Sequence, residues 1–323
     1  MVYGSAGTGK SVVGYHRVLE LERRFSQEED GQLPILFTTF NRHLSNVQEQ
    51  LIRNLARQQN HDVVPPRVEI KNIDRVAHAL CKKAKVTPLE RVGEPKDRAL
   101  SAALRGSNLL ERFTHQYLED EILRVIKGRG IKDFETYADL DRMGRLVRFS
   151  RSVREEMWSV YEKYEKELGT ERDFERNVLD ALEFAEQQPP QYRACVVDEI
   201  QDFSLAKLQL VRALVSEPNG GDVPPDGLML LGDSGQKIYP GGCRPKDAGI
   251  GIQGRGRSYT LTRQYRNSQE ILDAAVAVAG EDLIPSPHND LEMIRRAAST
   301  HGAPITGIKP RIVTCSSDEQ QDQ

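Results

Sequence analysis

The feature that most constrains this chain is a glycine-rich segment near its start, GSAGTGKS at Gly4–Ser11. It fits the pattern G-x-x-x-x-G-K-[ST], a loop whose backbone N–H groups surround nucleotide phosphates. Lys10 would neutralise the β- and γ-phosphates, and the Ser11 hydroxyl would complete a Mg²⁺ shell. The motif predicts a strand stub entering the loop and a helix behind it at Ser11–Arg24. The residues expected to hold the nucleotide are Gly4, Ser5, Ala6, Gly7, Thr8, Gly9, Lys10 and Ser11.

A second motif, far along the chain, is acidic. The apolar run Ala194–Val197 is followed directly by Asp198 and Glu199. At a strand end, Asp198 suits a Mg²⁺ ligand and Glu199 suits the general base that orients an attacking water. The alternative is a pair that only caps the next helix, and the Gln201-Asp202 pair that follows favours the functional interpretation. Together the two motifs predict an NTP-hydrolysing protein, or a piece of one.

Composition indicates a soluble globular protein. The 323 residues are enough for two domains, with 29% charged and 38% hydrophobic residues. No apolar stretch approaches the ~18 residues of a membrane span. Four cysteines without a C-x-x-C pair argue against structural zinc and a disulfide framework, and they fit a reducing cytoplasm. Because the net charge is −3, any nucleic-acid contact would have to use local patches.

Apolar and helical segments alternate over most of the chain. This order predicts an α/β fold with a parallel sheet and a site at the carboxyl ends of its strands. The expected strands are Pro34–Thr39, Val68–Ile70, Ala194–Val197 and Leu228–Leu231, and the expected helices include Arg42–Gln58, Asp74–Lys83 and Ser268–Ala279. Between about residues 86 and 188 the sequence is charged and helical, which predicts an insertion that Pro189–Pro190 ends.

Four blocks then occur in order along the chain. They are LFTTFNRHL at Leu36–Leu44, DEIQD at Asp198–Asp202, LLGDSGQKIY at Leu230–Tyr239 and LTRQYRNSQEI at Leu261–Ile271. With the phosphate loop, these blocks resemble the UvrD/Rep family of superfamily 1 DNA helicases. The resemblance covers essentially the whole chain, although in the middle of the chain it depends on the helical pattern of the sequence more than on motifs.

The resemblance implies roles for further residues. In the second block of the family, Thr39, Phe40 and Asn41 would meet single-stranded DNA. Gln236 would sense the γ-phosphate and Tyr239 would stack on a base. Arg266 would be the arginine finger, acting beside Glu199 in catalysis.

The implied fold is a RecA-like P-loop domain that binds ATP and Mg²⁺. Residues 1–85 and 189–258 would form the first motor domain, 86–188 a helical insertion, and 259–323 the start of an incomplete second motor domain. The implied function is an ATP-dependent DNA helicase or translocase that moves on single-stranded DNA, with single-stranded or partly duplex DNA as partner. The alternatives are a nucleotide-dependent switch or interaction module without unwinding activity, and an inactive fragment.

This sequence departs from the family pattern in three ways. The adenine-reading glutamine of the family lies upstream of the phosphate loop, where this chain has almost nothing. Pro240–Asp247 lacks the aromatic that usually follows the third block, and the later blocks, with the second arginine finger, have no counterpart in the 57 residues beyond Arg266. A fragment with uncertain activity is therefore expected.

The insertion also contains arginines at every third position. They are Arg142, Arg145, Arg148, Arg151 and Arg154. On a helix they would form roughly one stripe, which could contact DNA phosphates. A solvated face paired with nearby glutamates explains the pattern equally well.

Overall fold

A parallel sheet forms the centre of this protein. The computed structural model describes residues 1–26, 33–58, 67–86, 94–142, 145, 147–233, 244–251, 257–279 and 307. Within these ranges the sheet has six strands in the order β3-β2-β4-β5-β1-β6, all paired in parallel. The strands are β1 (Val2–Gly4), β2 (Ile35–Thr39), β3 (Val68–Asn72), β4 (Ala194–Val197), β5 (Leu228–Gly232) and β6 (Tyr259–Leu261).

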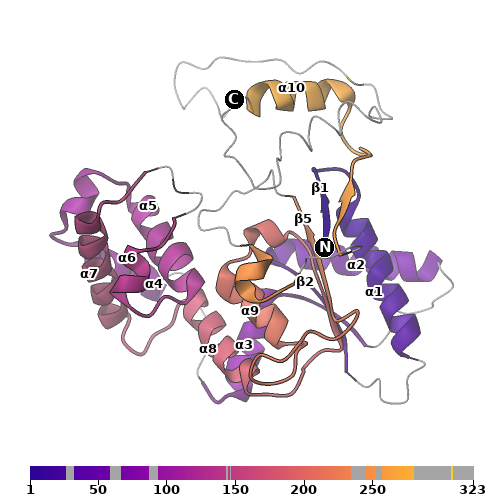
Figure 1. Cartoon of the computed structure of the whole chain (residues 1–323), viewed down its shortest axis with the longest axis horizontal. Coiled ribbons are helices and arrows are strands. Elements are labelled where there is room, and N and C mark those ends of the chain that lie inside the picture. The colour runs from indigo at the N-terminus through magenta and orange to yellow at the C-terminus, as the bar shows by residue number, and fades with distance from the viewer. Residues whose placement is uncertain are drawn as a thin grey trace.

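Helices cover both faces of the sheet (Figure 1). On one face lie α1 (Lys10–Phe25) and α2 (Arg42–Gln58). On the other lie α3 (Ile73–Lys83), α8 (Phe174–Glu186) and α9 (Leu205–Ala213), with the short helix η6 (Pro245–Ala248). Side-chain caps begin three of these helices, because Asn72, Asp173 and Ser204 accept hydrogen bonds from backbone N–H groups of the first turn.

The side chains of the strands alternate between the two helical layers. In β2, Ile35 and Phe37 join the core beneath α1 and α2, whereas Leu36 joins the core beneath α3, α8 and α9. In β4, Val196 and Val197 divide in the same way. The central strands are therefore apolar on both faces, as expected of a parallel sheet buried on both sides.

The helical insertion has a core of its own. Its elements are α4 (Glu94–Leu104), η1 (Asn108–Glu111), α5 (His115–Asp120), the π-helical turn η2 (Glu121–Ile126), η3 (Lys127–Arg129), α6 (Phe134–Ala138) and α7 (Arg151–Leu168). Buried side chains between Ala99 and Leu168 form a cluster separate from those of the sheet. In Figure 1 these helices stand to one side of the sheet layers.

Most expected elements are present close to their expected bounds. The structure adds β6 and α9, which no sequence pattern indicated, and it divides the insertion into short helical pieces. Two elements pack differently from the expected domain boundaries. α8, which was expected within the insertion, packs on α3 and α9. β6, which was expected to open the second motor domain, extends the sheet beside β1. The division into domains remains a proposal. α10 (Gln269–Ala279) follows β6.

Close packing of α1 on the sheet depends on Gly14. A Cβ at this position would lie 2.5 Å from Leu231 Cδ1 and 3.1 Å from Phe37 Cε2, and both of those side chains are fully buried. The helix that carries the end of the phosphate loop can approach β2 and β5 this closely only because residue 14 has no side chain.

Gly14→Ala should therefore lower the free energy of unfolding. The added methyl group overpacks the core, which typically costs about 1–3 kcal/mol, against a gain in helix propensity of up to about 1 kcal/mol. We expect a net loss of about 1–2 kcal/mol by urea denaturation. Val12→Ala, at an exposed position of the same helix, is the control and should change stability by no more than about 0.5 kcal/mol. A more stable Gly14→Ala protein would contradict the packing argument.

Candidate nucleotide-binding site

The phosphate loop leaves β1 at Gly4 and turns into α1 at Lys10. Gly7 and Gly9 have φ values of 85° and 88°, a left-handed conformation that side chains disfavour. A Cβ on Gly4 would lie 2.3 Å from Thr8 Oγ1, so the loop closes tightly on itself. The Thr8 hydroxyl donates to the Ser5 carbonyl at 2.8 Å and holds this closed form.

Lys10 is buried beneath the loop rather than extended into solvent. Its Nζ donates to the carbonyls of Gly4 at 2.8 Å and Ser5 at 3.1 Å, and it lies 3.9 Å from Asp233 Oδ2. Asp233 follows β5, the strand between β1 and β4. The ammonium group thus stands between the phosphate loop and the acidic strand ends, where phosphate oxygens could replace the loop carbonyls.

Asp198 follows β4 and is completely buried. Gln48 Nε2, from α2, donates to its Oδ2 at 2.8 Å, and the Glu199 N–H donates to its Oδ1 at 3.0 Å. Burial raises the pKa of Asp198 to about 6; a hydrogen bond from the Ser11 side chain and the charge of Lys10 oppose this rise, and the charge of Glu199 adds to it.

The donor set at Asp198 fits a Mg²⁺ ion. Mg²⁺ is usually bound by one or two carboxylates together with substrate phosphates and waters. The Ser11 hydroxyl lies close enough to the Asp198 carboxylate to lower its pKa. In the described part of the chain, no cluster of three or more His, Cys, Asp or Glu side chains could hold a metal ion by itself.

Glu199 has a strained backbone, with φ 53° and ψ 47°. Gln201 Nε2 donates to Glu199 Oε2 at 2.6 Å, and Gln201 Oε1 accepts from the Asp233 N–H at 3.0 Å. One amide therefore fixes the predicted general base relative to the end of β5. Gln201, Asp233 and Gln48 were not predicted to be site residues. Gln201 and Asp233 lie within recognised blocks, whereas no pattern in the sequence marked Gln48.

The segment after β6 lies directly on the phosphate loop. The Tyr265 N–H donates to the Gly7 carbonyl at 2.9 Å, and Asn267 Nδ2 donates to the Ala6 carbonyl at 3.2 Å. The Cβ of Arg266 lies 2.9 Å from the point that a Cβ on Gly7 would occupy. The side chain of Arg266 is exposed. Arg266, the predicted arginine finger, is thereby placed beside the loop, although its catalytic role remains a prediction.

The predicted DNA-contacting residues at the end of β2 differ in accessibility. Thr39 is fully buried, and its hydroxyl has no hydrogen-bond partner among the described residues. Phe40 is half-buried, with Lys207 Nζ 4.5 Å from its ring centroid, and Lys207 pairs with Asp74 at 2.9 Å. Asn41 is exposed, and its side chain caps α2 by accepting from the His43 N–H. Gln236 and Tyr239 lie outside the described residues.

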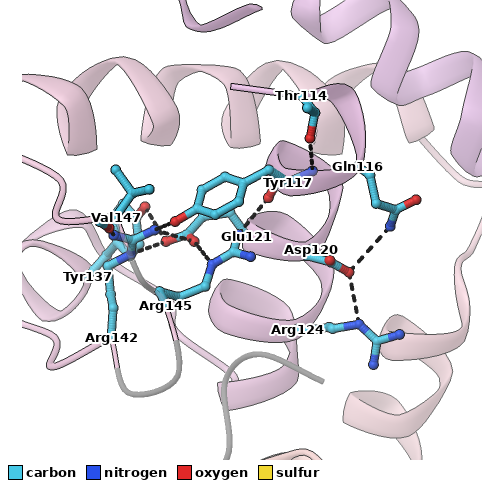
Figure 2. Close-up of polar contacts among 10 residues, drawn as sticks. All are labelled: Thr114, Gln116, Tyr117, Asp120, Glu121, Arg124, Tyr137, Arg142, Arg145 and Val147. Atoms are coloured by element: carbon cyan, nitrogen blue, oxygen red, sulfur yellow. Dashed lines mark hydrogen bonds and ion pairs between the residues drawn. The ribbon is translucent and has the colours of Figure 1, made fainter. Parts of the chain in front are cut away.

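The arginines of the insertion do not form a helical stripe. The segment from Arg142 to Ser150 precedes α7 and is not helical where it is described. Arg142 contacts both oxygens of the fully buried Glu121, at 2.6 and 2.7 Å, and Arg145 Nε donates to Oε2 at 2.8 Å (Figure 2). These contacts lower the pKa of Glu121 against the effect of burial. Arg142 and Arg145 are therefore structural residues of the insertion.

Two other members of the arginine series also have protein partners. Arg151 donates to both oxygens of Glu135 at 2.9 Å. Arg154 donates to the carbonyls of Tyr137 and Leu140. The interpretation as a phosphate-binding stripe is wrong for Arg142 and Arg145, because both guanidinium groups are turned inward and bond the buried Glu121.

The insertion approaches the acidic segment through the charge of Arg124 on η2 and the packing of η3 on α9. Arg124, on η2, donates a hydrogen bond to Asp120 at 2.9 Å (Figure 2). The positive charge of Arg124 also lowers the pKa of Asp202, against the stronger effect of burial. Burial raises the pKa of Asp202 to about 6, and the charge of Glu199 adds to this. A Cβ on Gly128 would lie 3.2 Å from Ser204 Cβ, so η3 packs against the start of α9.

No helix among the described residues is long and apolar enough to cross a membrane.

Comparisons with known proteins identify the family that this chain matches. A family model described as the UvrD/REP helicase N-terminal domain matches residues 1–240 of the chain. The proteins named "ATP-dependent DNA helicase UvrD1" of Mycobacterium bovis (strain ATCC BAA-935 / AF2122/97) and Mycobacterium tuberculosis (strain ATCC 25618 / H37Rv) are each 34% identical over 136 residues. The protein of that name from Mycobacterium leprae (strain TN) is 33% identical over 138 residues. Each match covers 37% of this chain and 17% of the relative.

Asp198→Asn should raise the free energy of unfolding of the nucleotide-free protein at pH 7. The folded-state pKa of Asp198 is raised from 3.8 to about 6, so stability is lost as pH rises through that window. A shift of this size corresponds to at most about 3 kcal/mol. Since the amide has no charge to desolvate, the gain should shrink as pH falls from 7 to about 4.

Urea denaturation at several pH values, without Mg²⁺, measures this difference. Asp222→Asn makes the same change at an exposed position and should stay within about 0.5 kcal/mol of the parent. An Asp198→Asn protein that loses stability at pH 7 would show that its neighbours stabilise the ionised carboxylate more than burial disfavours it.

Proposed function

The chain belongs to the UvrD/REP helicase N-terminal domain family, and from that premise we propose that it binds Mg²⁺–ATP and hydrolyses it. The hydrolysis would serve an ATP-dependent DNA helicase or translocase of the UvrD/Rep type that moves on single-stranded DNA. Single-stranded or partly duplex DNA is the proposed partner.

One observation carries this proposal. The strands β1, β5 and β4 are neighbours, and the groups at their carboxyl ends are Lys10, Asp233 and Asp198. A closed glycine loop, a buried cation and a carboxylate beside a hydroxyl therefore meet at one edge. This combination can bind a nucleotide phosphate together with a divalent cation.

Each group has a distinct role in the proposed reaction. Lys10 would neutralise the β- and γ-phosphates, and Ser11 and Asp198 would hold Mg²⁺, which when bound offsets the charge of the phosphates. Glu199 would orient a water in line with the γ-phosphate and accept its proton. Arg266 would add positive charge from the opposite side of the loop.

DNA contact is proposed for the end of β2. Phe40 and Asn41 follow that strand on the same sheet edge as the nucleotide groups. The Phe40 ring is partly accessible, and aromatic side chains bind single strands by stacking on bases. Thr39 could take part through its backbone, since its side chain is buried. Gln236 and Tyr239 keep their proposed roles from the family resemblance.

Lys10→Ala should abolish nucleotide binding and hydrolysis, because the cation at the phosphate site is removed. Glu199→Gln should retain binding and slow turnover by about 10²–10⁴-fold, since an amide cannot accept the proton. Fluorescent-nucleotide titration and a phosphate-release assay measure the two effects. Hydrolysis by the Lys10→Ala protein at the parent rate would refute the site. Equal loss of binding and turnover in Glu199→Gln would make Glu199 a structural residue.

Phe40→Ala should weaken single-stranded DNA binding by about 1–3 kcal/mol through lost base stacking. Fluorescence anisotropy with a labelled oligonucleotide measures the DNA affinity. Thermal denaturation checks that the Phe40→Ala protein is still folded, since the ring is half-buried. Phe174→Ala, an exposed ring on α8 outside the four blocks, should leave affinity unchanged. Unaltered DNA affinity in a folded Phe40→Ala protein would show that Phe40 does not contact the DNA. ATP hydrolysis that is equally slow with and without DNA would favour a nucleotide-dependent switch over a helicase or translocase.

A further inference from the structure

The chain contains a clamp on the phosphate loop, formed by residues 264–267. Its position follows from strand pairing, because Gly4, where the loop begins, is the parallel partner of Leu261. Both strands end at the same level of the sheet, so the residues after β6 extend over the residues after β1. The clamp contacts three consecutive loop residues, which are Ser5, Ala6 and Gly7.

Contact between clamp and loop is close enough to require glycine. A Cβ on Gly7 would lie 2.8 Å from Gln264 Oε1 and 2.9 Å from Arg266 Cβ. Since Gly7 also has a positive φ, both the shape of the loop and the approach of the clamp depend on the missing side chain.

Gln264 is the most buried residue of the clamp, with 1% of its surface exposed. Its Nε2 donates to Ser5 Oγ at 2.6 Å, a buried hydrogen bond between residues 259 positions apart. Its Oε1 has no hydrogen-bond partner among the described residues. The carboxamide is therefore held against the loop by one bond, to a residue of the predicted nucleotide site.

We propose that Gln264 is a positioning residue of the nucleotide site, which acts through the Ser5 hydroxyl to hold the phosphate loop in its closed form. This inference rests on the proposed nucleotide binding. The backbone N–H groups of such a loop bind phosphate together only when the loop is curled around it. A loop that is already held in this form loses less conformational freedom on binding, so its affinity is higher.

The same residue also determines where Arg266 lies. Gln264 and Asn267 bond the loop on either side of Arg266, so the backbone of Arg266 is held beside Gly7. Gln264 thus links two parts of the site that are remote in sequence. A role limited to packing the sheet edge would affect folding stability and leave nucleotide affinity unchanged.

A double-mutant cycle on Gln264 and Ser5 tests the proposal with MgADP as the probe. Gln264→Ala and Ser5→Ala each remove the same hydrogen bond, and each should weaken MgADP binding by about 3- to 10-fold. The double variant should bind no more than slightly worse than either single variant, because the bond is already lost. Gln264→Met keeps the side-chain volume and should behave like Gln264→Ala.

The control is Gln269→Ala, at the start of α10, where the glutamine bonds Asp273 one turn along the helix. Its MgADP affinity should match the parent. Titrations are made at a temperature at which every variant is folded by circular dichroism, and Gln264→Met or Ser5→Ala replaces Gln264→Ala if that protein does not fold.

The possible results separate this inference from the proposed function. A folded parent that binds no MgADP would overturn both. A parent that binds, with Gln264→Ala, Gln264→Met and Ser5→Ala variants that bind equally well, would overturn only the role of Gln264. Effects that multiply in the double variant would show that Gln264 and Ser5 act independently, which also overturns it.

Discussion

The candidate site depends on the parallel register that joins β1, β5 and β4. Pairing of Val2 with Leu231, and of Val197 with Leu230, aligns the three strand ends, so that Lys10, Asp233 and Asp198 converge. Parallel strands require long crossover connections, and here those connections carry the helices that bury both faces of the sheet. The site therefore forms only after strands more than 190 residues apart in sequence have paired.

Charges are buried in two different ways in this protein. Glu121 is matched by two arginines and a tyrosine hydroxyl, and these contacts keep it ionised inside the insertion. At the candidate site the compensation is incomplete, because burial raises the pKa of Asp198 and of Asp202. Incomplete compensation is expected where a ligand is to bind, since a cation can supply the missing charge.

The insertion packs beside the start of α9, which follows the acidic segment. η3 packs against Ser204, and Lys127 is buried in contact with Asp173, the cap of α8. Arg124 lies near Asp202, three residues after Glu199. These groups place charges of the insertion close to the segment that contains Glu199.

The sequence alone determined the fold class, most elements and the members of the two nucleotide motifs, because these are local patterns. Glycine spacing, apolar runs and a strand-end acidic pair are encoded within a few neighbouring residues, and the structure contains the corresponding loop and strands. Only the tertiary structure decided which distant residues assist them. Gln48 reaches Asp198 across 150 positions and Gln264 reaches Ser5 across 259, and such pairings leave no periodic signal. For the arginine series the local pattern was misleading. Its three-residue spacing indicated a helical stripe, but two of its members instead pair with the buried Glu121 inside the insertion. An uncompensated buried carboxylate is costly, and this cost outweighed the local pattern.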